Sequence, residues 1–202
     1  MNDDSDALVD LCRLFGRRQW CPATGGNFSL RRDESHIQIT RSGSDKSRLN
    51  ADDLMLCDLD GRALDELSKP SAETALHTRL YRLDRRIGAV LHTHSVTSTV
   101  LSRATTGDLR LRGFEMQKAL AGNQSHEDEI VIAVFDNNQD IAALAERVEL
   151  RWHDAELSQP GLLVRGHGLY AWGETLDDAR RHIECFEFLF ACAWQEMLLR
   201  SQ

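Results

Sequence analysis

The stretch Gly88-Ala-Val-Leu-His92-Thr-His94-Ser95 decides the fold that we expect for this chain. Small and apolar residues lead into two histidines that are separated by one threonine. In a β-strand, successive side chains point to opposite faces, so His92 and His94 share one face and Thr93 takes the other. Histidine is the commonest metal ligand, and two imidazoles on one face can bind a single ion. Such a pair is more often an ordinary surface or hydrogen-bonded pair, so a metal site needs further ligands.

A third candidate ligand is His167, which lies between Gly166 and Gly168 at the junction of two short apolar segments. Glycine on each side allows the backbone to turn sharply and to approach another element closely. The alternative is a histidine that only bonds to backbone in a tight hairpin. Together with His92 and His94 it predicts a three-histidine site, whose open fourth position is typical of a catalytic metal.

On both sides of the histidine strand in the sequence, the hydrophobic pattern predicts short strands mixed with helices. Strands are expected over 27–31, 36–40, 54–59, 130–134, 162–165 and 168–172, and a hairpin joins the first two. Helices are expected over 6–20, from 70–73 onward with Ser71 as N-cap, over 96–104 and 139–151, and from Thr175 to about Leu199. The segment 111–117 stays unassigned. This order predicts an α/β fold with a single domain over 1–202, in which helices cover both faces of a central, mostly antiparallel sheet.

The composition is that of an acidic globular protein. The chain has 202 residues, 42% of them apolar and 28% charged, and its formal net charge is −8. This charge argues against a nucleic-acid partner, which needs a basic surface. There is no apolar run of about eighteen residues, so we expect no membrane span, and the acidic N-terminus lacks a signal-peptide pattern. A cytoplasmic location is therefore expected. The five cysteines lack Cys-x-x-Cys spacing, which disfavours disulfides and a cysteine zinc site.

Two polar loops have the composition of a phosphate site. The Gly25-Gly26-Asn27 segment can direct consecutive backbone N–H groups into a concave nest. Ser42 and Gly43 offer a hydroxyl and a backbone N–H, and a lysine follows close by. A serine at a helix N-terminus adds the helix dipole. Each signal alone is ordinary turn chemistry, but their occurrence beside three histidines predicts a phosphate site. Its residues are Gly26, Asn27, Ser42, Gly43, Lys46 and Ser71.

Two glutamates are candidates for proton transfer. Glu73 lies in the expected first turn of a helix, where a carboxylate commonly complements the dipole. Glu115 stands between Phe114 and Met116, and apolar surroundings raise the pKa of a carboxyl group toward neutrality. The alternative for Glu115 is a solvated position at a helix start. His77 follows Glu73 by one helical turn and could support the site, although the sequence favours a packing role.

Five short segments between residues 20 and 175 form a further pattern. They are Thr24-Gly-Gly-Asn27-Phe-Ser29, Ile39-Thr-Arg-Ser42-Gly43, Pro70-Ser71-Ala-Glu73, His92-Thr-His94-Ser95 and Gly166-His167-Gly168. In this order they resemble the zinc-dependent class II aldolase family, and the resemblance covers nearly the whole chain. Four other segments resemble the members of the family that dehydrate a sugar phosphate. These segments are 114–120, 125–127, 134–140 and 167–173.

The resemblance implies a class II aldolase-like fold and one Zn²⁺ per subunit on His92, His94 and His167. It also implies a small sugar phosphate as substrate, a homotetramer with sites at subunit interfaces, and Glu115 as the acid–base residue. Aldolases of the family use a glutamate at the position of Glu73. Since this chain has both, we rank Glu115 above Glu73 without treating Glu73 as idle.

Three alternatives stay open at this point. The chain could be an aldolase or epimerase for another sugar 1-phosphate, because fold and metal do not determine the reaction. It could be a non-catalytic oligomeric module of the same fold, although the three histidines argue against this. The site could also accept iron, cobalt or manganese, since histidine ligands suit several first-row metals.

Overall fold

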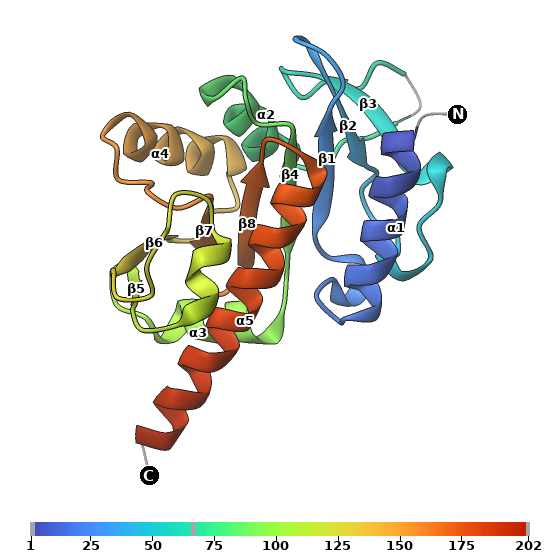
Figure 1. The fold of residues 1–202 in the computed structure, drawn as a ribbon. Coiled ribbons are helices and arrows are strands. Elements are labelled where there is room, and N and C mark those ends of the chain that lie inside the picture. The colour runs from blue at the N-terminus through green and yellow to red at the C-terminus, as the bar shows by residue number, and fades with distance from the viewer. Residues whose placement is uncertain (1–2, 66–67, 201–202) are drawn as a thin grey trace.

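The computed structural model describes residues 3–65 and 68–200, so the expected domain limits, 1 and 202, lie outside the described residues. Eight strands form one sheet in the order β3-β2-β1-β4-β8-β7-β6-β5 (Figure 1). Among the described strands, β6 and β7 pair in parallel and the other neighbours pair antiparallel. The predicted mostly antiparallel sheet is therefore confirmed. The strands are β1 (Asn27–Arg31), β2 (His36–Thr40), β3 (Leu54–Asp58), β4 (Ala89–Thr93), β5 (Leu109–Leu111), β6 (Ile130–Phe135), β7 (Gly161–Val164) and β8 (Gly168–Gly173).

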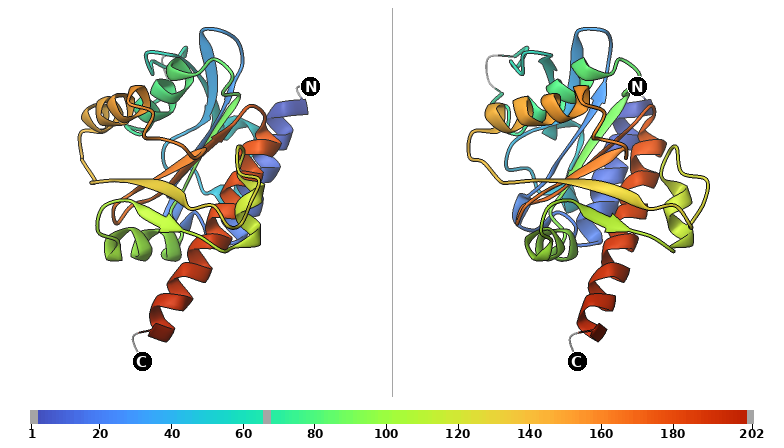
Figure 2. Two further views of the ribbon diagram at one scale, coloured as in Figure 1. Left: turned by 60° about the vertical axis from the view of Figure 1, so that its left-hand side comes forward. Right: turned by 90° about the vertical axis from the view of Figure 1, so that its left-hand side faces the viewer.

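Helices cover both faces of the sheet, as the sequence predicts (Figure 2). On one face lie α1 (Asp3–Arg17), α3 (Val96–Ala104) and α5 (Leu176–Arg200), and their apolar side chains share one core with that side of the sheet. On the other face, α2 (Thr74–Leu83) and α4 (Ile141–His153) close a second core. None of the helices within 3–65 and 68–200 is long and apolar enough to span a membrane. The described part of the chain also contains four 3-10 helices: η1 (Pro22–Thr24), η2 (Lys46–Arg48), η3 (Ala51–Asp53) and η4 (Glu115–Ala119).

Strand β4 lies inside the sheet, between β1 and β8, and all five of its residues are buried. Its side chains alternate between the two cores, as the pleat of a strand requires. Leu91 packs in the core under α5, whereas Val90 packs in the core under α2. The same alternation sends Thr93 toward α5 and stacks the His92 ring on Tyr170 of the opposite core. The histidine strand is thus held from both sides.

The end of helix α1 differs from the prediction. Helix α1 ends at Arg17 and not at Trp20, because Gln19 adopts φ 59° and the Trp20 N–H bonds back to the Phe15 carbonyl, 3.1 Å away. A residue with positive φ after the last turn ends a helix in this way. The unassigned segment 111–117 contains the end of β5 and the start of η4.

Ser71 does not cap α2, which corrects the prediction. The helix begins at Thr74, and Glu73 occupies the cap position. The Ser71 hydroxyl instead accepts a bond from the Glu73 N–H at 3.3 Å, and the Ser71 carbonyl accepts one from the Thr74 N–H. Because of this turn before the helix, Ser71 and Glu73 lie close to the histidines.

Candidate metal centre

Four side chains converge at the end of β4. The Nε2 atom of His92 lies 2.7 Å from that of His94 and 3.3 Å from that of His167. Glu73 Oε1 lies 2.8 Å from His167 Nε2 and 3.4 Å from His92 Nε2. All four ligand atoms lie within 4.8 Å of one another. The structure therefore brings the three predicted histidines together and adds Glu73, which the sequence indicated only as an acid–base candidate.

Local structure gives His92 the tautomer of a metal ligand. Its Nδ1 atom lies 2.9 Å from the Leu169 carbonyl oxygen, so Nδ1 carries the proton and donates it. The Nε2 atom then presents a lone pair to the cluster. A backbone carbonyl on the other ring nitrogen is the usual partner of a metal-binding histidine.

His167 reaches the cluster from the turn between β7 and β8. Gly168, the next residue, lies so close to β4 that a Cβ atom there would be 2.0 Å from the Thr93 carbonyl oxygen. Glycine is therefore required for the approach of β8 to β4, as the sequence predicted. The Thr99 hydroxyl of α3 donates a bond of 3.1 Å to the His167 carbonyl and holds the turn.

The cluster has the chemistry of a cation site. Burial lowers the pKa of His92, and burial together with His92 and His167 lowers the pKa of His94 to about 3. The His94 imidazole is therefore neutral near pH 7, and its Nε2 atom faces that of His92 at 2.7 Å. Without a proton or a metal ion between them, two lone pairs at this distance repel. Three imidazole nitrogens and one carboxylate oxygen suit zinc and its first-row neighbours.

Glu73 is held as a carboxylate in this cluster. Burial raises its pKa, but polar interactions with the His167 and His92 rings lower it more, so that the net pKa lies well below the usual range. Its second oxygen, Oε2, accepts a bond of 2.6 Å from the Asn27 amide. Glu73 can therefore bind a cation or accept a proton beside one.

All six predicted phosphate residues line one cavity of about 230 Å³ next to the cluster. Gly26 adopts φ +76°, and a Cβ atom there would lie 2.5 Å from the His92 carbonyl, so this loop also depends on glycine. Ser71, Glu73 and His94 belong both to this cavity and to a larger cleft of about 620 Å³. A phosphate in the small cavity would thus leave the rest of its molecule beside the metal-binding set.

Lys46 does not offer a free ammonium group to this cavity. The side chain is buried, and Nζ donates bonds of 2.9 Å to the carbonyls of Thr24 and Ser44. It ties the two polar loops together and places positive charge behind them. The cavity also contains Arg41, which the sequence reasoning did not single out although it directly precedes Ser42.

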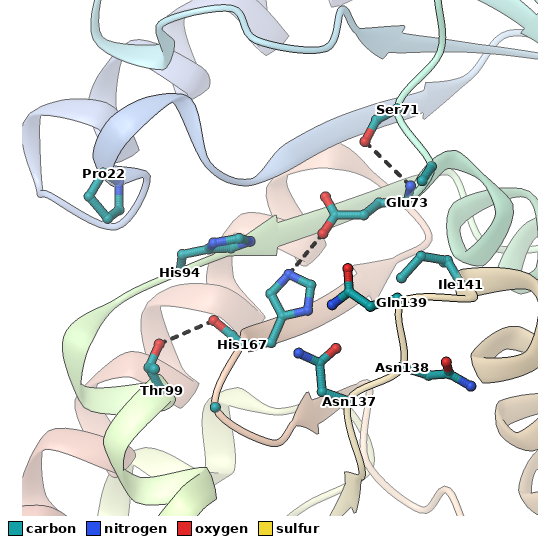
Figure 3. Close-up of a pocket in the computed structure, with 12 residues that line it drawn as sticks. Pro22, Ser71, Glu73, His94, Thr99, Asn137, Asn138, Gln139, Ile141 and His167 are labelled. Carbon is teal, nitrogen blue, oxygen red and sulfur yellow. Dashed lines mark hydrogen bonds and ion pairs between the residues drawn. The ribbon is translucent and has the colours of Figure 1, made fainter.

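The larger cleft contains polar residues that the sequence reasoning missed as site residues. In Figure 3, the side chains of Asn137 and Gln139 lie beside His167, on the loop between β6 and α4. Both residues are at least partly exposed. These residues belong to an amide-rich run directly after the buried strand β6. Side chains that follow a strand gather at the edge of the sheet, so this run could have indicated them as site residues.

Glu115 lies apart from the metal-binding set within the chain, and it does not line either cavity. The expectation of an apolar environment and a raised pKa is wrong. The side chain is 71% exposed, Oε1 lies 2.6 Å from Lys118 Nζ, and Oε2 lies 3.3 Å from His126 Nδ1. Its hydrogen bond with Lys118 lowers its pKa. Phe114 and Met116 flank Glu115 in sequence, but in η4 its carboxylate points toward solvent.

Comparison with known proteins gives a family match and close relatives. The sequence profile described as "Class II Aldolase and Adducin N-terminal domain" matches residues 6–194. The chain is 52% identical over 203 residues to a protein of Pectobacterium atrosepticum named methylthioribulose-1-phosphate dehydratase, covering 100% of this chain and 98% of that protein. A Yersinia enterocolitica protein of the same name is 53% identical over 194 residues, covering 96% and 92% of the two chains.

Solved structures share the fold at lower identity. An L-fuculose-1-phosphate aldolase from Thermus thermophilus has a TM-score of 0.75 and 24% identity, covering 98% of this chain and 95% of that one. YgbL from Escherichia coli, described as a putative aldolase/epimerase/decarboxylase, has a TM-score of 0.79 and 22% identity, covering 94% and 87%. These likenesses concern the arrangement of the chain alone.

Proposed function

The chain belongs to the class II aldolase and adducin family, and we propose that it dehydrates 5-methylthioribulose 1-phosphate to 5-methylthio-2,3-dioxopentyl phosphate. The reaction removes the C3 proton and the C4 hydroxyl, and the resulting enol becomes a 2,3-diketone with the release of one water. This is a hydro-lyase step of methionine salvage. Relatives that are about half identical over their full length carry the name of this activity.

One geometric observation carries the proposal. Ser71, Glu73 and His94 line both the small cavity and the larger cleft, so the metal-binding set lies at their junction. A ketose 1-phosphate has its carbonyl carbon next to the carbon that bears the phosphate. Binding of the phosphate in the small cavity would therefore bring the carbonyl to the metal-binding set, which is the kind of positioning that accelerates a reaction.

The phosphate would be bound by the two polar loops. The Gly26–Asn27 and Ser42–Gly43 segments offer N–H groups, and Ser71 offers a hydroxyl group at the cavity. Lys46 would act from behind the loops, through its bonds to Thr24 and Ser44 and through its charge.

Zn²⁺, one per subunit, is the cation that we propose for His92, His94 and His167, with Glu73 beside it. When bound, the ion supplies Lewis acidity to the substrate carbonyl, which makes the C3 proton easier to remove. The chain's own groups would then move the protons. Glu73 Oε1, which already lies in the cluster, is placed to accept a proton from a bound substrate.

Glu115 would donate a proton to the leaving hydroxyl, and in this proposal it serves the site of a neighbouring subunit. Its exposed position, away from the histidines of its own chain, suits a homotetramer with sites at subunit interfaces. Contact with a partner would also bury the carboxyl group and raise its pKa, as an acid that works near neutral pH requires.

The test is incubation of the zinc-loaded protein with 5-methylthioribulose 1-phosphate, with the products identified by mass. Loss of one water without loss of carbon is the expected result. An aldehyde fragment would instead support the second candidate, an aldolase, which the fold likeness and the placement of Glu73 in the cluster make the closest alternative. A protein without bound metal and without either activity would favour a non-catalytic module.

A further inference from the structure

A continuous chain of hydrogen bonds leads from Glu73 into the interior of the molecule. Glu73 Oε2 lies 2.6 Å from Asn27 Nδ2, and Asn27 Oδ1 lies 2.7 Å from His77 Nε2. Beyond this, His77 Nδ1 lies 2.7 Å from Ser29 Oγ, and Ser29 Oγ lies 2.9 Å from the Tyr81 hydroxyl. Asn27, Ser29, His77 and Tyr81 are all buried, so water does not compete for these bonds.

The regular spacing of a strand and of a helix makes this chain possible. Glu73, His77 and Tyr81 are four residues apart at the start of and along α2, which places them about 6 Å apart on one face. Asn27 and Ser29 are two residues apart on one face of β1, which is about 6.7 Å. Because the two repeats nearly match, the strand side chains fit between those of the helix.

The direction of every bond follows from the carboxylate at its end. Glu73 as a carboxylate only accepts, so Asn27 must turn its NH₂ group toward it. The Asn27 oxygen therefore faces His77 and needs a donor at Nε2. Burial lowers the pKa of His77 to about 3, so the ring carries a single proton and its Nδ1 accepts from Ser29. The Ser29 oxygen in turn accepts from Tyr81.

We propose that His77 is a positioning residue for the metal centre. As the neutral Nε2–H tautomer it holds the Asn27 amide in the orientation that donates to Glu73, and so keeps Glu73 Oε1 among the three histidines. His77 touches neither the metal-binding atoms nor the cavities, and it acts through Asn27. This inference rests on the metal site of the proposed function but not on the identity of the substrate.

Two substitutions at His77 separate this role from simple packing. In His77→Gln, the side-chain amide can reach the position of Nε2 and donate to Asn27. In His77→Asn, the shorter amide reaches only the position of Nδ1, and the donor to Asn27 is lost. Tyr81→Phe is the matched control, because it removes a buried hydrogen bond at the far end of the chain and leaves the bonds at Asn27 intact.

Three quantities are measured for each variant: the affinity of the metal-free protein for Zn²⁺ by competition with a chelator, kcat and KM for the dehydration, and the melting temperature. We expect His77→Asn to lower zinc affinity and kcat by roughly 10–100-fold, the usual effect of losing a group that orients a ligand. His77→Gln should retain a higher zinc affinity and a higher kcat than His77→Asn. Tyr81→Phe should lower the melting temperature with a much smaller change in zinc affinity.

The inference is overturned if His77→Gln and His77→Asn lose zinc affinity equally, or if Tyr81→Phe loses as much zinc affinity as His77→Asn. Should the His77 variants not fold, ¹⁵N spectra of the histidine rings in the unmodified protein decide the matter. They must show His77 protonated at Nε2, and protonation at Nδ1 contradicts the proposal. A protein that binds zinc but does not dehydrate the substrate would contradict the proposed function and leave the zinc-affinity and spectral readouts valid.

Discussion

The carboxyl group of Glu187, on α5, lies 3.0 Å from the hydroxyl of Thr93, directly behind the strand that carries His92. Glu187 is 4% exposed, and it also bonds to Ser95. Burial raises its pKa to about 7, although the bonds from Ser95 and Thr93 lower it in part. An ionisable group thus supports the histidine strand from the face opposite the metal-binding set.

Glu187 should make the metal-free protein less stable as pH rises. Its folded-state pKa of about 7 lies above the ordinary value of 4.5, so the folded state holds the proton more tightly. As pH rises through the range between these two pKa values, the free energy of unfolding falls by about 3 kcal/mol at most. It stays at the lower level above that range. Urea unfolding from about pH 4.5 to about pH 8 checks this. In Glu187→Gln this part of the pH dependence should disappear, and an unchanged slope would contradict the assignment.

Zinc affinity should depend little on pH in the mildly acidic range. Imidazole must be neutral to bind a metal. Burial lowers the pKa of His92, and burial together with His92 and His167 lowers that of His94 to about 3, so protons compete less for these two rings than for free imidazole. Chelator competition between about pH 8 and about pH 6 should therefore give nearly constant affinity. His92→Ala should abolish stoichiometric binding, and a variant that still bound one equivalent would exclude His92 as a ligand.

Lys46→Met should raise KM for the phosphorylated substrate more than it lowers kcat. The substitution leaves the carbonyls of Thr24 and Ser44 without their buried donor, at a cost of about 2–3 kcal/mol in stability. Steady-state kinetics and thermal unfolding measure the two effects. The control is Lys69→Met, which removes the same charge outside the residues that line the phosphate cavity.

Glu115→Gln should keep zinc but lose dehydration, by roughly 10²–10⁴-fold. If Glu115 serves the neighbouring subunit, a mixed oligomer of Glu115→Gln and His92→Ala chains should recover activity, because each chain supplies what the other site lacks. The mixed state is verified by two affinity tags. A more severe loss in Glu73→Gln would reverse our ranking of the two glutamates, and mixed oligomers without activity would place Glu115 in its own subunit's site or outside both.

Gln139→Leu should raise KM by roughly 10-fold and leave zinc affinity unchanged. The Gln139 side chain lies beside His167 in the larger cleft, where its amide can bond to a substrate hydroxyl (Figure 3). Asn138→Ala is a suitable comparison, because the Asn138 side chain accepts a bond from the Asp140 N–H in its own loop. Equal effects of the two changes would indicate a disturbed loop and not a lost contact.

Much of the fold could be predicted from local pattern. The apolar residues along 88–95 predicted β4 as a buried strand. The period of the hydrophobic residues, together with the turn residues, located most of the other strands and the central parts of most helices. Helix boundaries were harder to predict where the backbone conformation of one residue or one turn decided them. Gln19 ends α1 by taking a positive φ, and the turn before Thr74 delays α2, neither of which has a clear sequence signal.

The sequence by itself determined which groups could bind a metal. His92 and His94 share a strand face, His167 stands between glycines, and Gly26, Asn27, Ser42 and Gly43 carry the donors of the proposed phosphate site. These are properties of residue type and of spacing within one element, which a strand or a turn converts directly into geometry.

Only the tertiary structure decided how groups from different elements meet. It placed Glu73 with the histidines, buried Lys46 behind the loops, and left Glu115 in solvent. It also joined Glu73 to Tyr81 through β1 and α2. Burial and partner distance, which decide both pKa and ligand geometry, depend on packing between segments that lie far apart in the chain, and local sequence does not contain that information.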